Sequence, residues 1–297
     1  MTGTGMTAAP RTILDKIWDA HVVRDLGCGW SLLHIDRHLL HDLSGPPALA
    51  GVRRRGLSVR NPELVFATPD HIVSSQPGRT GASFAPGKRL YDGLRDLSAA
   101  AGIRFFDLGE EGQGIVHVMA PEMAIALPGT TLICGDSHTC TNGGVGALAF
   151  GVGTSESTHA LATGTLQLQR PKRMRIRLDG RLGVGVAPKD VILHILRTLG
   201  AEAGVEHSIE FAGAAIAAMP VEGRLTLCNL AVEMGARSGL VAPDDTVFSW
   251  IEGRRFAPRG AVFDHAVTTW QALATDADAR FDRDERIDAA TIAPTIT

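Results

Sequence analysis

The first half of the chain alternates between helical and extended hydrophobic patterns. Residues 13–20 place apolar side chains at helical spacing, whereas residues 114–119 and 130–134 form short apolar runs bounded by Gly, Asp or His. Such runs between helices predict strand and helix units around a mostly parallel sheet. From Thr12 to about Gln169 we therefore expect an α/β domain with its chemistry at the carboxyl ends of the strands.

The pattern changes near Arg170, where basic residues nearly alternate with other residues up to Arg177. We interpret this run as a strand with one solvated face, in preference to an anion-binding site. Turn-forming residues follow, and regular elements are expected again after them. These are a helix over 189–199, a strand over 208–211 and a helix over 227–234 that Gly235 helps to end.

These patterns predict two α/β domains with a boundary near residue 170. The stretch 275–288 is dense in Asp and Arg with almost nothing apolar, which predicts a solvated linker. The first residues are small and polar and lack the order of a secretory signal. The predicted organisation is a disordered leader over 1–11, a first domain over 12–170, a second over 171–274 and, over 275–297, a linker toward a further domain.

Composition narrows the classes of function. The chain has 297 residues, an apolar fraction of 44% and a formal net charge of −3, so it lacks the dense basic surface of a general nucleic-acid binder. No apolar run approaches the length that spans a bilayer. Its four cysteines have no paired spacing, which favours reduced thiols. We expect a cytoplasmic protein that acts on a small molecule.

Three groups of polar residues interrupt apolar surroundings. Asp70 and His71 follow one apolar run, His117 lies inside another, and residues 136–138 directly follow a third. Each group places an imidazole at or near a predicted strand end, where general acid–base catalysis or metal ligation is usual. A single histidine of this kind more often satisfies a buried backbone group, but three together favour a functional site.

Two of these groups contain a carboxylate close to an imidazole. Asp70 is next to His71, and Asp136 and His138 are two residues apart, so the latter share a face if the backbone there is extended. A carboxylate in that position can fix the tautomer of the imidazole or raise its basicity. We therefore treat both pairs as candidate dyads.

A further polar pair lies in the second predicted domain. Asn229 and Glu233 are four residues apart on the predicted helix, hence on one face of it, in a segment that is otherwise apolar. A buried glutamate is rare without a partner, which favours a role at a site. Placement on the helix surface is an equally open alternative.

Five segments taken together resemble one enzyme family. They are DRHLLHD (36–42), FATPDHIVSSQ (66–76), QGIVHVMAPE (113–122), LPGTTLICGDSHTCTNGGVGALAFGVGTSE (127–156) and EGRLTLCNLAVEMGARSGLVAPD (222–244). In order and with few gaps, from about Ile13 to Ala274, the chain resembles the aconitase superfamily, above all the large subunits of bacterial 3-isopropylmalate dehydratases. The resemblance implies aconitase-type three-layer α/β/α domains with a mostly parallel sheet, as in the first two domains of that iron–sulfur subunit.

The resemblance assigns roles to the polar groups. Asp70 and His71 match the Asp-His pair that hydrogen-bonds and protonates the departing hydroxyl. His117 matches a histidine near the cluster that pairs with a carboxylate, and Asp136 is the implied carboxylate.

The other matches complete this site. Ser137 and His138 continue the Asp-Ser-His motif of the family, and Glu233 matches the carboxylate that pairs with the histidine of that motif. Asn229 matches an asparagine near the cluster. The implied catalytic residues are Asp70, His71, His117, Asp136, His138 and Glu233, with Ser137 and Asn229 close to substrate and cluster.

The implied activity is that of a hydro-lyase of leucine biosynthesis. Dehydration of 2-isopropylmalate and rehydration with the opposite regiochemistry give 3-isopropylmalate, which requires a Lewis acid on the hydroxyl, a proton donor and a base. In the family a 4Fe-4S cluster is the Lewis acid, and a separate small subunit carries the base. We expect that small subunit as partner, a 2-hydroxy dicarboxylate as substrate, and neither nucleic acid nor membrane.

The chain departs from the family pattern in its cysteines. The family holds its cluster with a Ser-Cys-Thr-Asn-Ser type motif and a Cys-x-x-Cys pair in a third domain, whereas no cysteine follows Cys228 here. Since a cluster needs thiolate ligands, we expect no metal held by this chain alone and no activity from it alone. Pro47 also replaces a glutamine that contacts substrate in close relatives.

Several alternatives stay open. A truncated gene product, a natural split subunit and a deliberately shortened protein would all have this sequence. A non-catalytic binding or assembly module is one rival function. A related dehydratase that acts on another 2-alkylmalate or on homoaconitate is a second.

Overall fold

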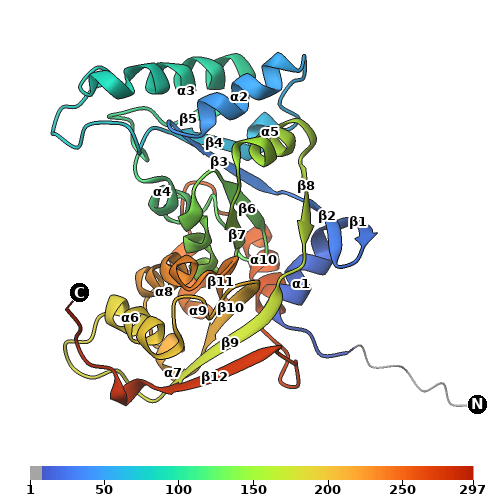
Figure 1. Cartoon of the computed structure of the whole chain (residues 1–297), viewed down its shortest axis with the longest axis vertical. Coiled ribbons are helices and arrows are strands. Elements are labelled where there is room, and N and C mark those ends of the chain that lie inside the picture. Colours follow the sequence, from blue (N-terminus) through green and yellow to red (C-terminus); the bar gives the residue numbers. More distant parts are fainter. Residues whose placement is uncertain (1–8, 297) are drawn as a thin grey trace, which may run out of the picture.

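The structure, a computed structural model, describes residues 9–296. Residues 1–8 of the predicted leader lie outside the described residues, and residues 9–11 form no helix or strand. Two parallel sheets organise the rest of the chain, one in the upper and one in the lower half of Figure 1. No helix among residues 9–296 is long and apolar enough to cross a membrane.

The first sheet is parallel throughout, with strand order β5-β4-β3-β6-β7. The chain enters at the central strand, moves outward to one edge and then returns to the other side of the centre. The order therefore reverses between β3 and β6, and this is the position where open α/β sheets bind ligands. The strands are β3 (Arg37–His41), β4 (Val65–Thr68), β5 (Arg104–Phe105), β6 (Thr131–Cys134) and β7 (Leu148–Gly151).

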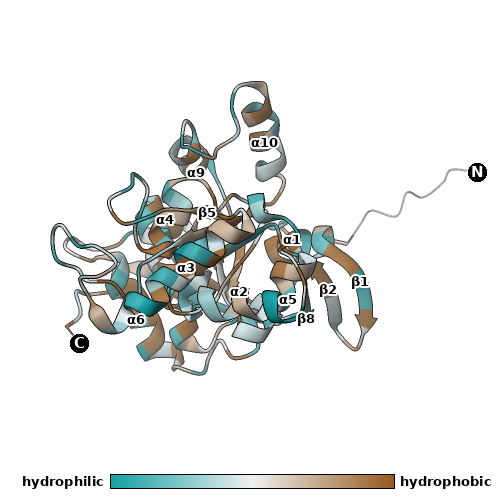
Figure 2. Cartoon of the chain, turned by 90° about the horizontal axis from the view of Figure 1, so that it is seen from above, coloured by the Kyte–Doolittle hydropathy of each residue, from teal (hydrophilic) through white to brown (hydrophobic). Residues whose placement is uncertain are grey.

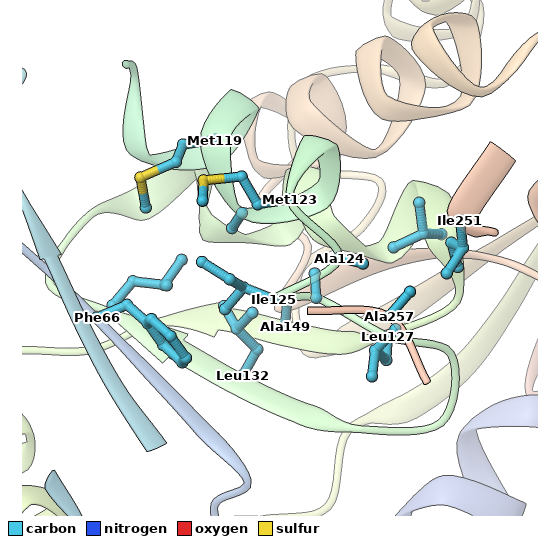
Figure 3. Close-up of a cluster of buried hydrophobic side chains, with 14 of the residues drawn as sticks. Phe66, Met119, Met123, Ala124, Ile125, Leu127, Leu132, Ala149, Ile251 and Ala257 are labelled. Carbon is cyan, nitrogen blue, oxygen red and sulfur yellow. The ribbon is translucent and has the colours of Figure 1, made fainter. Parts of the chain in front are cut away.

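Helices cover both faces of this sheet, because consecutive strand residues point to opposite sides. Leu40 packs with helices on one face of the sheet, and Leu39 packs with helices on the other. Figure 3 shows the hydrophobic cluster on the Leu39 face. The first face carries α2 (Gly45–Arg54), α3 (Lys88–Ala101) and α5 (Thr154–Thr163). The second carries α4 (Val116–Glu122), α9 (Asp245–Ile251) and α10 (Ala261–Gln271). The predicted three-layer α/β arrangement is confirmed.

One predicted strand of this half is wrong. Residues 114–119 were expected to be extended, but Val116 begins α4. The buried positions Val116, Met119 and Ala120 have helical spacing, which the short apolar run concealed. The carboxylate of Asp70 also accepts the N–H of Val116 at the helix start, at 2.7 Å.

A small antiparallel sheet flanks the first one. Its order is β1-β2-β8, and its first hairpin projects from the rest of the molecule in Figure 2. The predicted N-terminal helix is confirmed as α1 (Ile13–His21), which starts with a capping box between Thr12 and Asp15. The strands are β1 (Val22–Gly27), β2 (Trp30–His34) and β8 (Thr165–Gln169).

The second sheet is also parallel, with order β11-β10-β9-β12. The predicted strand with one solvated face is confirmed, because burial alternates along β9. The strands are β9 (Lys172–Asp179), β10 (His207–Ala212), β11 (Ser238–Val241) and β12 (Arg283–Asp288). Its buried face packs against α6 (Pro188–Leu199), α7 (Ala214–Ala217) and α8 (Val221–Asn229).

The helix expected over 227–234 has different limits. It begins earlier, as α8, and continues as a 3-10 segment, η4 (Leu230–Met234), that ends at Gly235 with φ +75°. Glycine is favoured there because a left-handed backbone conformation strains other residues. The remaining 3-10 segments are η1 (Pro62–Leu64), η2 (Ala85–Gly87), η3 (Ser137–Val145) and η5 (Ala289–Thr291).

The last part of the chain also differs from the expectation of a solvated linker. Residues 283–288 form β12, which pairs with β9, and Ile287 is buried in the core of the second sheet. The many charges belong to an edge strand, where Asp284 pairs with Arg175 of β9. In addition α9 and α10, expected in the second domain, pack on the first sheet.

Candidate functional site

Three neighbouring strands of the first sheet end in polar residues at the same edge. β4 leads into Asp70 and His71, β3 ends with His41 and leads into Asp42, and β6 leads through Gly135 into Asp136. Since β3 lies between β4 and β6, these side chains meet above the central strand. The candidate site is therefore at the position where the strand order reverses.

His71 lies between two carboxylates. Its Nδ1 is 2.5 Å from Asp70 Oδ1 and its Nε2 is 2.9 Å from Asp136 Oδ2, so both ring nitrogens have an anionic acceptor. These hydrogen bonds, with Asp136 first, raise the pKa of His71 to about 10. The ring remains partly exposed, and at neutral pH it presents an imidazolium to the surface of the site.

Asp136 connects three groups. Its Oδ2 bonds to His71, while its Oδ1 lies 2.9 Å from His117 Nε2 and accepts the N–H of His138 at 2.7 Å. The hydrogen bonds from His117 and His71 hold the pKa of Asp136 well below its usual range. Nδ1 of His117 is buried and has no hydrogen-bond partner among the described residues.

The expected extended geometry of Asp136 and His138 does not occur. Asp136 is the N-cap of η3, and its carboxylate accepts the backbone N–H of His138. It does not form a close pair with the imidazole ring of His138. Nδ1 of His138 is 3.8 Å from Asp136 Oδ1 and 3.2 Å from Ser137 Oγ. Asp136 is therefore the partner of His117 and His71, as the resemblance implied for His117.

The other ring nitrogen of His138 faces the second sheet. His138 Nε2 lies 3.2 Å from Glu233 Oε1 in η4, and Asn229 Nδ2 donates to Thr141 Oγ1 at 2.8 Å. Asn229 and Glu233 thus both face η3, on the side their spacing suggested. Glycine permits the close approach of η3 to α8, because a Cβ on Gly144 would lie 2.6 Å from the backbone nitrogen of Leu225.

Two residues of the site were missed by the sequence analysis. Asp42 is fully buried and accepts the N–H groups of residues 70–72, and the ring of His41 stacks on that of His71. The segment His-Leu-Leu-His-Asp at the end of an apolar run carries the same signal as the other strand ends. In the sequence it stands out only through the family resemblance.

The group His41, Asp42, Asp70 and His71 brings four potential ligand atoms within 4.8 Å of one another. Each of these side chains already takes part in hydrogen bonds. Both oxygens of Asp42 accept backbone N–H groups, and those of Asp70 bond to His71 and to the N–H of Val116. We therefore interpret the group as a hydrogen-bond network and not as a metal site.

The four cysteines do not form a donor set for an iron–sulfur cluster. Cys134, Cys140 and Cys228 are buried, and Cys28 is exposed on the β1–β2 hairpin. Burial raises the pKa of Cys140 to about 12 and that of the other two well above the usual range, whereas cluster ligands are thiolates. No group of cysteines in the described part of the chain is placed to hold a metal.

A cavity of about 290 Å³ opens beside the site. Asp136 and Ser137 line it, together with Arg237, whose guanidinium lies over the ring of Phe150 at 5.3 Å. Arg237 forms no ion pair with any described carboxylate. It is an available cation next to a site rich in carboxylates.

Comparison with known proteins places the chain among related sequences. A family model described as Aconitase family (aconitate hydratase) matches residues 15–297. The 3-isopropylmalate dehydratase large subunit 1 of Bradyrhizobium diazoefficiens is 53% identical over 287 residues, which cover 97% of this chain and 60% of the relative. The 3-isopropylmalate dehydratase large subunit of Anaeromyxobacter dehalogenans is 47% identical over 293 residues, covering 97% and 61%.

The chain thus spans about three fifths of the length of these curated relatives. Among solved structures, histidinol dehydrogenase from Elizabethkingia anophelis aligns with 95% of this chain and 62% of that chain, at 12% identity and a TM-score of 0.19. A likeness at that level says nothing about a shared fold.

Proposed function

This chain belongs to the aconitase family, and we propose that it supplies the acid–base residues of a hydro-lyase that interconverts 2-isopropylmalate and 3-isopropylmalate. Both relatives described above carry the name of the 3-isopropylmalate dehydratase large subunit. The observation that carries the proposal is His71, an imidazolium held between two carboxylates at the edge where the strand order reverses.

His71 is suited to protonate a leaving hydroxyl. Loss of water breaks a C–O bond, and the departing oxygen takes a proton from the imidazolium, which becomes neutral. A carbon-bound proton must pass to a base in the same reaction. His71 is charged at neutral pH and partly exposed, so it can protonate a substrate when one ring N–H exchanges its carboxylate acceptor for the departing oxygen. Asp70 and Asp136 hold the ring in place and stabilise its charge.

The other matched residues receive supporting roles in this proposal. His117 shares Asp136 with His71, so the two rings form one hydrogen-bond network. His138 is oriented by Glu233 in the same way. We place Ser137 and Asn229 close to substrate and cluster, as the family resemblance implies.

A dicarboxylate substrate fits the charge distribution beside the site. The residues already described there are mainly anionic, and a substrate dianion needs a cation to approach them. Arg237 lines the adjacent cavity with no carboxylate partner among the described residues. Arginine binds carboxylates bidentately, so we propose that Arg237 takes one carboxylate of the substrate.

The cofactor and the partner belong to the proposal as well. A 4Fe-4S cluster supplies Lewis-acid chemistry in the aconitase family, but the cysteines of this chain do not fit it. We propose that the cluster ligands lie in the part of the relatives' length that this chain does not span. We also propose that a small subunit completes the site, as the words "large subunit" in the relatives' names suggest. The unpaired cysteines are consistent with the reducing cytoplasm.

Reconstitution tests the activity. We would combine this chain with a dehydratase small subunit and with the part of the Bradyrhizobium relative that the alignment leaves out, then add iron and sulfide without oxygen. The ultraviolet absorbance of the alkene intermediate reports dehydration of 2-isopropylmalate. Conversion of this substrate is expected. A folded assembly that dehydrates no 2-alkylmalate would exclude the proposal, and preference for another 2-alkylmalate or for homoaconitate would identify a related dehydratase.

A non-catalytic binding or assembly module is the second candidate, because the buried cysteines leave this chain without cluster ligands. Calorimetric titration with 2-isopropylmalate and analytical ultracentrifugation with the small subunit separate the two functions. Affinity for ligand or subunit without turnover in the reconstituted assembly would favour the module.

A further inference from the structure

Three consecutive backbone N–H groups point at one buried carboxylate. Asp42 Oδ1 accepts the N–H groups of Asp70 and His71 at 3.2 and 2.9 Å, and Oδ2 accepts that of Ile72 at 2.7 Å. Asp42 is 0% exposed and has no ion-pair partner within residues 9–296. An unpaired buried carboxylate is costly unless hydrogen bonds satisfy it. The backbone of this loop therefore supplies the hydrogen bonds that satisfy the buried carboxylate of Asp42.

His41 supports the same loop from the central strand. Its ring stacks on that of His71 with centroids 3.8 Å apart and planes 16° from parallel. The N–H of Leu43 donates to His41 Nδ1, so the ring proton lies on Nε2, which faces Ser44 Oγ at 2.9 Å and the carbonyl of Gly135 at 3.2 Å. Burial first, and then the charge of His71, lower the pKa of His41. A neutral ring avoids placing a second cation against the imidazolium.

The strand order explains why His71 needs support. Its ring must span from the end of β4, where its backbone lies, to Asp136 at the end of β6, and β3 with His41 lies between them. The charged groups around the ring are Asp70 on its own loop, Asp136 after β6, and the Asp42 carboxylate below the loop backbone. A loop that shifted by about 1 Å would lengthen one of its two ion-pair contacts beyond hydrogen-bonding distance.

We propose that Asp42 and His41 are positioning residues. Asp42 fixes the backbone of residues 70–72, and His41 stacks against the ring of His71, so that this ring stays between Asp70 and Asp136. The proposed function explains why the enzyme would need this arrangement. The arrangement itself can be measured on this chain without substrate, cluster or partner.

Nuclear magnetic resonance of the ¹⁵N-labelled histidine rings is the test. Long-range ¹H–¹⁵N correlations distinguish a doubly protonated ring from each neutral tautomer. In the unaltered chain His71 should stay doubly protonated to about pH 10, while His41 is neutral with its proton on Nε2. A neutral His71 at pH 8 or a charged His41 at pH 7 would overturn the proposal.

Asp42→Asn is the decisive variant, because it keeps the shape of the side chain but replaces an acceptor oxygen with a donor. The pKa of His71 should fall by at least one unit toward the ordinary value of about 6.5. Asp190→Asn is the matched control, since Asp190 also accepts two backbone N–H groups, from Ala187 and Thr295, in the other half of the molecule. The control should leave the His71 titration unchanged. Equal titration of His71 in Asp42→Asn and the unaltered chain would refute the role of Asp42.

His41→Ala tests the stacking partner in the same spectra. It should lower the pKa of His71 by a smaller amount, because the ring can then tilt away from Asp136. His38→Ala is its control, since His38 is a buried histidine on the same strand that bonds to Ser157 instead. An unchanged His71 titration in His41→Ala would remove His41 from the proposal.

Amide hydrogen exchange keeps the proposal testable if Asp42→Asn does not fold. The amides of His71 and Ile72 in the unaltered chain should be protected at least tenfold more than that of Gln76, whose N–H is bonded only within its exposed loop. Exchange at the rate of an exposed loop would show that the Asp42 contacts do not form. Either outcome is independent of turnover, so the proposed function can fail while the positioning role stands.

Discussion

The two parallel sheets have the same design but differ in what happens at their carboxyl ends. In each sheet the strand order reverses beside an inner strand, between β3 and β6 in the first sheet and between β9 and β12 in the second. At the first reversal Asp70 and Asp136 share the ring of His71. At the second, Asp179 is paired with Arg177, and Asp288 accepts the N–H of Ala290.

The difference lies in how partners are distributed and in which cation is used. At the carboxyl ends of the second sheet, Asp179 has an arginine and Asp288 a backbone N–H as its own partner. Arginine does not release its proton in the physiological range. The carboxylates of the first sheet compete for histidines, which do exchange protons. A reversal of strand order therefore offers a position where a functional site can form. Acid–base catalysis there also requires titratable side chains that share hydrogen-bond partners.

The largest expected effect is on the shared histidine. His71→Gln removes the proposed proton donor while keeping a side chain of similar length, so turnover in the reconstituted assembly should fall by about 10²- to 10⁴-fold. The alkene assay measures this loss. His159→Gln, an exposed histidine on α5, is the control and should keep full activity. Equal rates for the two variants would exclude His71 as the acid.

Loss of an ion pair in the second half that shares no partner with the candidate site should affect stability and not catalysis. The guanidinium of Arg224 is fully buried and both its terminal nitrogens bond to Asp244 at 2.8 Å. Asp244→Asn keeps the cap of α9 but leaves the buried cation without its anion, so the free energy of unfolding should fall by about 3 kcal/mol. Urea denaturation measures the change.

Asp288→Asn is the control for that experiment, because Asp288 caps η5 and has no ion-pair partner among the described residues. It should cost less than about 0.5 kcal/mol. The two variants should also leave the titration of His71 as it is. A change in that titration in Asp244→Asn would mean that the two halves are coupled more tightly than their separate partners suggest.

The contrast also shows what the sequence could and could not predict. Short apolar runs followed by Asp and His correctly predicted that Asp70, His71 and Asp136 lie at strand ends. The prediction succeeded because the residues that can titrate directly follow the apolar residues that form the strands. The role of Asp42 depends on three backbone N–H groups of another loop, which no side-chain pattern displays. In the second half, the charges of β12 resembled a linker because their arginine partners lie on β9, more than 100 residues earlier.

The pH dependence of stability should differ between the two regions as well. The pKa of His71 is raised in the folded chain, so its contribution to stability is complete below about pH 6.5 and is lost as pH rises toward 10. The difference in unfolding free energy between the unaltered chain and His71→Gln should shrink by about 1 kcal/mol from pH 7 to pH 10, a value reduced for the partial exposure of the ring. Urea denaturation at both pH values tests this, and a difference that grew with pH would reverse the assignment.

The smallest effect is expected in the ladder of charges between β9 and β12. Arg175 pairs with Asp284 at 2.6 Å, but both side chains are partly exposed, so Asp284→Asn should cost only about 0.5 kcal/mol. Asp278→Asn, which breaks no ion pair within residues 9–296, is the control. The cost should be the same at pH 7 and pH 10, because Arg175 stays charged and the pKa of Asp284 is lowered. It should nearly vanish in 1 M salt. A cost that changed between pH 7 and 10 would show that this ladder also holds an exchangeable proton, and the distinction between the ladder and the first site would then rest on geometry alone.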